Sequence, residues 1–156
     1  MSCSKSKGHR IYVIDTSIII AALLSDITYE RLINCRMMRY TLSYVFSEVA
    51  RHKDELASWK SKKQCVSLDD VLEDFNRRLE VMRTELKEIP EDQVLPYWDQ
   101  AFTIIGWRDG GDVPIVALAL YLRDKLRTNV CIVSLDDDFV EATKHGFMWS
   151  RRPCDP

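Results

Sequence analysis

Carboxylates recur in the sequence where elements of secondary structure are expected to begin or end. Asp15 follows the apolar run 11–14, and Asp136 follows a second apolar run, 130–134. Asp112 stands immediately before the apolar segment 113–126. Neighbouring parallel strands lie about 4.8 Å apart, so carboxylates at their ends could share one cation. Without a cation, such carboxylates would raise one another's pKa values and destabilise the fold.

The residue types around these acids indicate which cation and which chemistry to expect. Carboxylates and hydroxyls offer only oxygen ligands, which favours Mg²⁺ or Mn²⁺ over zinc. The segments around these acids contain no Ser–His or Cys–His arrangement that would supply a protein nucleophile. The chemistry expected of such a site is therefore attack by a water molecule that the metal activates.

The elements that would position these acids alternate between strands and helices. Short apolar or edge strands are expected at 11–14, 40–43, 87–90, 130–134 and 147–149. The segment 113–126 has almost no polar face, so it is expected to be a buried central helix. Other helices are expected at 44–59, 67–86 and 91–107, with 60–64 as a basic loop and Arg77 and Arg78 solvated. This alternation predicts an α/β fold with helices on both faces of a parallel sheet.

Length and composition are those of an ordinary globular domain. The chain has 156 residues, of which 46% are hydrophobic and 29% charged, and no run is apolar for long enough to span a membrane. We expect a flexible N-terminus at 1–9, a single domain at 10–150 and a C-terminal tail at 151–156. A cytoplasmic location follows by default. A net charge of −2 counts against a general nucleic-acid coat protein but not against an enzyme with a basic rim.

The five cysteines show no Cys-x-x-Cys pair, which argues against both a zinc site and a secreted disulfide framework. Cys3 and Cys154 both lie near the termini and could pair, although most cytosolic proteins keep their thiols reduced.

Four motifs occur in an order that resembles the PIN-domain superfamily, and more narrowly its prokaryotic branch of toxin-type, VapC-like ribonucleases. They are Ile-Asp15-Thr-Ser17, Glu48 in Ser-Glu-Val-Ala-Arg-His-Lys, Asp109-x-x-Asp112 before Val-Pro-Ile-Val-Ala-Leu, and Ser134-x-Asp136-x-Asp138. The resemblance covers about residues 10–149. It implies a three-layer α/β/α fold with a central parallel sheet of four or five strands.

The resemblance also implies a function and a set of site residues. The activity is cleavage of RNA phosphodiester bonds with Mg²⁺ or Mn²⁺, and an antitoxin protein or a second copy of the chain would be compatible partners. The catalytic acids carried over are Asp15, Glu48, Asp112 and Asp136; Asp138 is a further metal ligand, and Ser17, Asp109 and Ser134 are supporting residues. Basic side chains would hold the flanking phosphates, with candidates at Arg51, Lys53, Lys60, Lys62 and Lys63, and at Arg151 and Arg152.

Simpler roles remain open for each acid taken alone. Asp15, Asp109, Asp112 and the acids at 136–138 could cap helices or form turns, and Glu48 could pair with Arg51 or His52 on a solvated helix. At the level of function, the alternative is a PIN-like domain that binds RNA or protein as a scaffold and does not cleave. A dehalogenase-type phosphatase would need a second Asp where this chain has Ser17, and a receiver domain would need its phosphoacceptor after a central strand together with a late lysine.

Overall fold

The computed structural model describes residues 10–154, and these contain a five-stranded sheet in which every strand pair is parallel. The strand order is β3-β2-β1-β4-β5. The strands are β1 (Arg10–Ile14), β2 (Arg39–Leu42), β3 (Lys87–Ile89), β4 (Asn129–Val133) and β5 (Met148–Ser150). The expected α/β fold with a central parallel sheet is confirmed. The residues expected to form a flexible start, 1–9, lie outside the described part of the chain.

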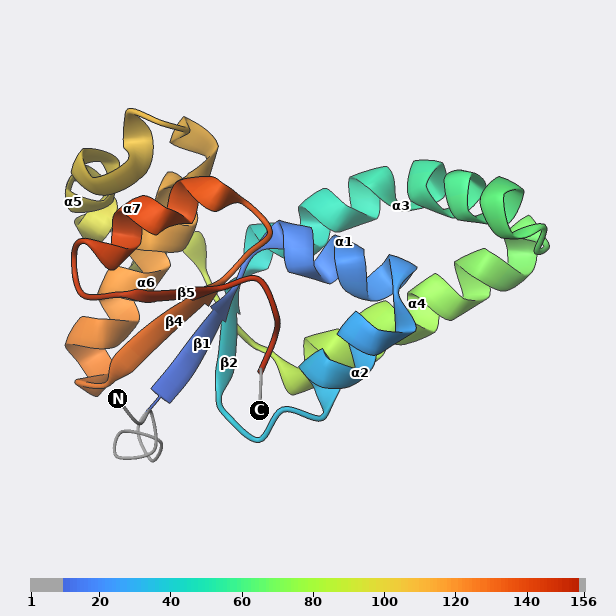
Figure 1. Ribbon diagram of the computed structural model, residues 1–156, viewed down its shortest axis with the longest axis horizontal. Coiled ribbons are helices and arrows are strands. Elements are labelled where there is room, and N and C mark those ends of the chain that lie inside the picture. The colour runs from blue at the N-terminus through green and yellow to red at the C-terminus, as the bar shows by residue number, and fades with distance from the viewer. Residues whose placement is uncertain (1–9, 155–156) are drawn as a thin grey trace.

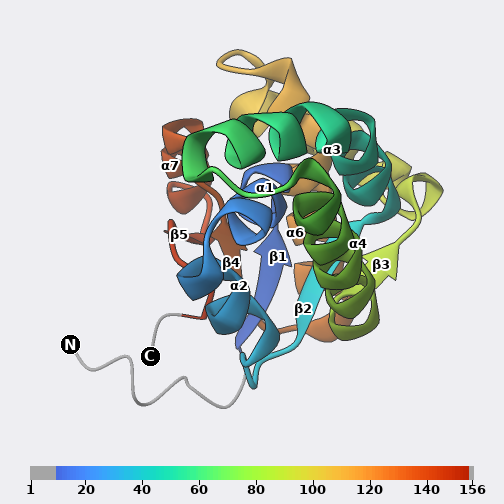
Figure 2. The same cartoon turned by 90° about the vertical axis from the view of Figure 1, so that its right-hand side faces the viewer.

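Helices cover both faces of the sheet (Figure 1). On one side lie α1 (Thr16–Leu24), α2 (Asp26–Ile33), α3 (Ser43–Gln64) and α4 (Leu68–Glu85), which Figure 2 shows in front of the strands. On the other side lie α5 (Trp98–Ala101), α6 (Val113–Leu126) and α7 (Val140–Thr143). The far ends of α3 and α4 project beyond the sheet as a helical hairpin. None of the helices within residues 10–154 combines the length and apolar character needed to cross a bilayer.

Helix α6 is the central helix that its sequence predicts. It packs against β1, β2 and β4, and its residues 115–120 are all buried. Pro114 lies in the first turn, where its missing N–H leaves no bond unmade. Because α6 follows directly from Asp112, this packing also fixes the position of one acid of the site.

Two cations that the sequence suggested were solvated are instead buried between α1 and the hairpin. Helix α3 continues to Gln64, so the expected basic loop is its last turn, and Lys60 Nζ donates to the carbonyl oxygen of Leu23 at 3.2 Å. Arg78 Nη1 donates to the carbonyl oxygen of Ala22 at 2.9 Å. Both carbonyls belong to the last turn of α1, which has no basic residue of its own. The cations therefore satisfy carbonyls that the helix end leaves unpaired.

The segment expected to be one helix at 91–107 is broken into short pieces. It contains turns of 3₁₀ helix at Glu91–Gln93 and Leu95–Tyr97, then α5, and then a π-helical turn at Phe102–Gly106. Pro96 removes a backbone donor in this region, which opposes a continuous helix. Trp98, which lies in this broken segment, is 37% exposed.

A disulfide bond joins Cys35, in the loop after α2, to Cys154. The expectation that Cys3 could pair with Cys154 is therefore wrong for Cys154, and Cys3 itself lies outside the described residues. The residues expected to form a tail also make contacts: Arg151 Nη1 donates to the carbonyl oxygen of Leu135 at 3.3 Å and the same side chain pairs with Asp137. The sequence could not show the disulfide or the contacts of Arg151, because both depend on where the chain returns after β5.

Replacing Leu118 with Ala tests the central position of α6. Leu118 is fully buried, so the substitution should lower the free energy of unfolding by about 2–5 kcal/mol. Leu126→Ala is the matched control, since Leu126 belongs to the same helix but is 47% exposed. Urea unfolding measures both. Equal losses for the two variants would contradict the central role of α6.

Reduction of the disulfide should destabilise the protein by about 2–4 kcal/mol, because the bond closes a long loop in the unfolded chain. The check is thermal unfolding with and without a thiol reductant, with Cys35→Ser expected to reproduce the reduced value. Cys65→Ser is the matched control, because Cys65 is exposed and its replacement should leave the response to reductant intact. Cys131→Ser is unsuitable because Cys131 is buried. A response that persists unchanged in Cys35→Ser would rule out this bond.

Candidate functional site

The pairing of β1 with β4 brings the first acid to the site. Ile14 lies opposite Val133 in this parallel pair, so the next residues, Asp15 and Ser134, are neighbours at the carboxyl edge of the sheet. The backbone N–H of Asp15 continues the ladder by donating to the carbonyl oxygen of Val133 at 3.1 Å. Ligands of open parallel sheets bind at this edge.

Two serines hold the Asp15 carboxylate in place. Ser134 Oγ donates to Asp15 Oδ2 at 2.7 Å, and Ser17 Oγ donates to the same oxygen at 3.0 Å. Each hydroxyl also accepts a backbone N–H from the loop after β4: Ser17 accepts from Leu135 at 3.1 Å, and Ser134 accepts from Asp136 at 3.0 Å. The two serines thus connect the orientation of Asp15 to the loop that carries Asp136.

Four other acids form a compact cluster next to this edge. Asp109, Asp112, Asp136 and Asp138 each contribute one carboxylate oxygen, and these oxygens all lie within 4.8 Å of one another. The first two acids come from the turn before α6, and the last two come from the loop after β4. The described residues thus include a group of oxygen ligands at the spacing a divalent cation would need.

Helix capping accounts for two of these acids but not for the others. Asp109 Oδ1 accepts the N–H of Gly111 and Asp136 Oδ1 accepts the N–H of Asp138, both at 2.9 Å. Asp15 and Asp112 stand at the positions just before α1 and α6, yet neither side chain makes a capping hydrogen bond. Helix capping therefore does not explain why Asp15 and Asp112 are acids.

Asp112 carries the strongest sign that the cluster lacks a positive partner. Its side chain is buried, and Oδ2 has no hydrogen-bond partner among the described residues. Burial raises the pKa of Asp112 to about 8, and hydrogen bonding with Asp136 and the charges of Asp136, Asp109 and Asp15 act in the same direction. A buried carboxylate oxygen without a partner, in an all-oxygen group, fits Mg²⁺ or Mn²⁺.

Arg108 neutralises only the outer side of the cluster. Its Nε lies 3.0 Å from Asp138 Oδ1, and its Nη1 lies 2.9 Å from Glu141 Oε1. Lys144 and Arg108 together hold the pKa of Glu141 below its usual range. Asp138 is thus the one acid of the four with an ion pair within the described residues, and Asp112 is left without one.

Glu48 does not belong to this compact group, but its charge and those of Asp15 and Asp112 act on the same neighbour, Tyr44. Glu48 and Tyr44 are on the first turns of α3, and both are half-buried. Burial raises the pKa of Tyr44, and the charges of Asp15, Glu48, Asp112 and Glu91 raise it further. The phenol therefore remains a hydrogen-bond donor among these acids. His52, one expected partner of Glu48, instead faces Glu55, with Nδ1 and Oε2 4.0 Å apart.

Tyr44 and Glu91 are site residues that the sequence reasoning missed. Glu91 comes two residues after the end of β3, at the same carboxyl edge as Asp15 and Asp136. Its position after an edge strand was therefore an available signal. Tyr44 had no such signal, because an aromatic residue at the start of a helix more often packs in the core.

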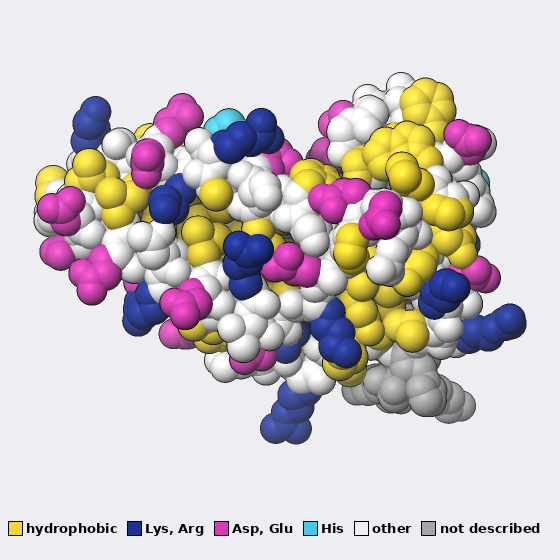
Figure 3. Space-filling view, turned by 180° about the vertical axis from the view of Figure 1, so that it is seen from behind, with side chains coloured by type: hydrophobic (Ala, Val, Ile, Leu, Met, Phe, Trp, Pro, Cys, Tyr) yellow, Lys and Arg dark blue, Asp and Glu magenta, His cyan; other side chains and the backbone are white. Residues whose placement is uncertain are grey.

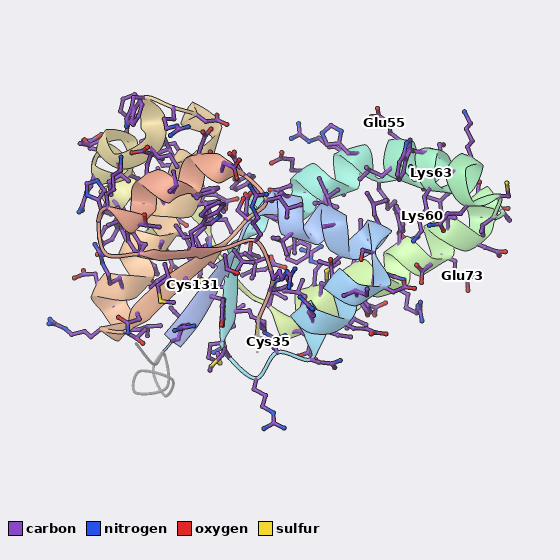
Figure 4. The ribbon with its side chains drawn as sticks, viewed as in Figure 1. Cys35, Glu55, Lys60, Lys63, Glu73 and Cys131 are labelled. Atoms are coloured by element: carbon purple, nitrogen blue, oxygen red, sulfur yellow. A yellow bond between two sulfur atoms is a disulfide. The ribbon has the colours of Figure 1, made fainter. Side chains whose placement is uncertain are left out.

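The basic residues expected to hold RNA lie in different surroundings. Lys60 is buried, and its ammonium lies 5.6 Å from the centre of the Phe75 ring, so it cannot be an exposed phosphate ligand (Figure 4). Lys53 Nζ donates to Asn76 Oδ1 at 2.8 Å, whereas Arg51, Lys62 and Lys63 are exposed. Lys63 follows Glu48 by fifteen residues of α3, about 22 Å along a helix, and so lies far from the acids.

Comparison with models of known protein families identifies this kind of domain. A family model described as a PIN domain matches residues 13–144, which include each of the acids discussed above. A search of curated proteins finds no similar sequence.

The raised pKa of Asp112 predicts how the stability of the metal-free protein depends on pH. An acid whose pKa rises from 3.8 to about 8 on folding stabilises the folded state below pH 4, and that contribution is lost as the pH rises through 8. The melting temperature should fall over this range. Mg²⁺ or Mn²⁺ should raise it more at pH 8 than at pH 6, because the cation competes with the proton.

Asp112→Asn should remove most of both effects. The control is Asp54→Asn, which changes an exposed acid of α3 outside the cluster. Thermal unfolding of the three proteins at both pH values, with and without the cation, makes the measurement. A gain from the cation that is the same in Asp112→Asn as in the wild type would show that Asp112 is not a ligand.

Proposed function

The chain belongs to the PIN domain family, whose members are generally metal-dependent nucleases, and we propose that it is a Mg²⁺- or Mn²⁺-dependent ribonuclease. The observation that carries this proposal is the buried, unpartnered Oδ2 of Asp112 within a group of four acids. A cation at that point supports phosphodiester hydrolysis, since phosphoryl oxygens and water are both ligands of Mg²⁺ and Mn²⁺.

The residues that would hold the cation are Asp112 and Asp136, with Asp109 and Asp138 beside them and Asp15 and Glu48 at the margin. When bound, the cation supplies an activated water molecule and neutralises charge on the phosphate. Asp15 is presented in one orientation by Ser17 and Ser134. Tyr44 keeps its hydroxyl proton and so can donate a hydrogen bond to a phosphate oxygen.

RNA would approach along α3. Arg51 and Lys62 are eleven residues apart, about three helical turns, so they lie on the same side of this helix. Both are exposed and could hold two phosphates, several nucleotides apart, of a strand that ends at the acids. Lys60 is left out of this surface because it is buried, and Arg152 is exposed in the segment after β5.

The proposal includes the toxin-type role that the resemblance to VapC-like ribonucleases implies. A ribonuclease of this type arrests growth when it is produced without an antitoxin. Induced expression of the wild type should therefore stop growth, and Asp15→Asn should not. An antitoxin and a homodimer are the partners proposed with this role.

Asp15→Asn should slow cleavage strongly without weakening RNA binding, because it removes a carboxylate beside the proposed cation and leaves the basic residues in place. Single-turnover cleavage of a single-stranded RNA with Mn²⁺ should slow by about a hundredfold or more. Asp54→Asn, which changes an exposed acid outside the site, should cut at the wild-type rate. If Asp15→Asn still cuts at that rate, the nuclease assignment fails.

The basic surface should show the opposite behaviour. Replacing Arg51 and Lys62 together with Ala should weaken RNA binding and reduce the slope of log K against log salt by about 1.4, because each is proposed to hold one phosphate. The metal-induced rise in melting temperature should stay unchanged. If the wild type binds RNA but cuts none, the protein is better described as a binding module.

A further inference from the structure

A hollow of about 480 Å³ lies directly beside the acidic site. Its lining includes Tyr44, Glu48 and Gly111, and the charges of Asp15 and Asp112 act on Tyr44. Gly111 lies between Asp109 and Asp112 in the turn before α6. The hollow therefore adjoins the turn that carries Asp109 and Asp112.

One wall of this hollow is apolar and accessible. It is formed by the broken segment before α6, where Leu95 is 58% exposed and Trp98 is 37% exposed. Figure 3 shows hydrophobic side chains gathered over this side of the molecule, next to acidic ones. An accessible indole beside a polar rim is the arrangement on which a flat aromatic ligand stacks.

The polar part of the lining consists of two carboxylates, the Tyr44 hydroxyl and the Trp98 indole N–H. Glu48 and Glu91 both line the hollow, and an ionised carboxylate only accepts hydrogen bonds. A ligand that fits must therefore offer donors at its edge and an aromatic face to Trp98. Adenine, guanine and cytosine carry an exocyclic amino group with two N–H donors. Uracil offers only its N3–H, which lies between two carbonyl oxygens that a carboxylate repels.

We propose that this hollow binds one unpaired nucleobase of the RNA, next to the phosphate that is cut, with the base stacked on Trp98 and its amino group donating to Glu91. The inference rests on the proposed ribonuclease function and adds a base preference to it. Since the hollow adjoins the acid group through Gly111 and Glu48, a strand whose phosphate lies on the acids brings a neighbouring base to it. A paired base could not enter, so the substrate is single-stranded at this position.

Mapping the cuts in a random-sequence RNA tests the preference. The wild type should disfavour uracil at one position beside the cut. Glu91→Gln should weaken that discrimination, because the amide N–H₂ can donate to the uracil carbonyl oxygens that a carboxylate repels. An unchanged pattern of cuts in Glu91→Gln would overturn the role of Glu91.

The stacking wall is tested by Trp98→Ala, which should weaken binding of the single-stranded RNA about tenfold or more. Trp98→Phe keeps an aromatic face and should restore most of the affinity. Phe102→Ala is the matched control, since Phe102 is 55% exposed on the same segment but does not line the hollow. If Trp98→Ala leaves affinity and base preference unchanged but alters the oligomeric state, the surface is a contact between copies of the chain and the proposal is wrong.

A measurement without cleavage separates this proposal from the one on which it rests. The tryptophan indole N–H resonances are recorded by NMR without metal, and that of Trp98 is assigned with Trp98→Phe. Millimolar adenosine or cytidine should shift it, uridine at the same concentration should shift it less, and ribose 5-phosphate should not. Shifts in a protein that cuts no RNA would keep the base site and remove the nuclease function. Cleavage by a protein whose Trp98 resonance responds to no nucleoside would overturn the base site alone.

Discussion

The register between β1 and β4 is the constraint on which the site depends. Because Ile14 pairs with Val133, Asp15 and Ser134 leave the sheet side by side, and a hydroxyl meets a carboxylate. A shift of one residue would send these side chains to opposite faces. Trp149 supports the same loop from β5, since its Nε1 donates to the carbonyl oxygen of Ser134 at 3.1 Å. The site is thus positioned by backbone pairing first and by side chains second.

The negative charge of the site is the second constraint. The strand register brings carboxylates together, and the repulsion between them destabilises that arrangement. The sheet edge collects carboxylates from the ends of three strands and from the turn before α6, while Arg108 pairs with only one member of the central group. The cost falls on Asp112, which is buried among them. Such a group of carboxylates destabilises the folded protein unless a cation binds to it. The unpaired charge therefore indicates that the ligand is a cation.

Much of the fold follows from local patterns in the sequence. The apolar runs that become β1 and β4 and the helix α6 were recognisable because burial on most sides leaves no polar face. The order of acids along the chain pointed to one sheet edge, and the structure brings Asp112, Asp136 and Asp138 together there, with Asp109. Glu48 lies outside that group, which spacing along the chain could not reveal.

What the sequence did not show depends on contacts between distant segments. Lys60 and Arg78 look like solvated charges until the end of α1 is placed beneath them. Trp98 fits a helical pattern that the break around Pro96 then interrupts. Cys154 meets Cys35 only because β5 runs parallel to β4 and returns the chain toward the loop after α2.

The position of the disulfide also determines what happens if the chain is cut. The bond joins residues 119 apart, and the turn between α3 and α4, with exposed Cys65 and Val66, lies inside that interval. A protease cut at this turn would leave two polypeptides that remain one covalent molecule and migrate together without a reductant. The tip of the hairpin is therefore a place where a label or an inserted sequence could be introduced without releasing either half of the protein.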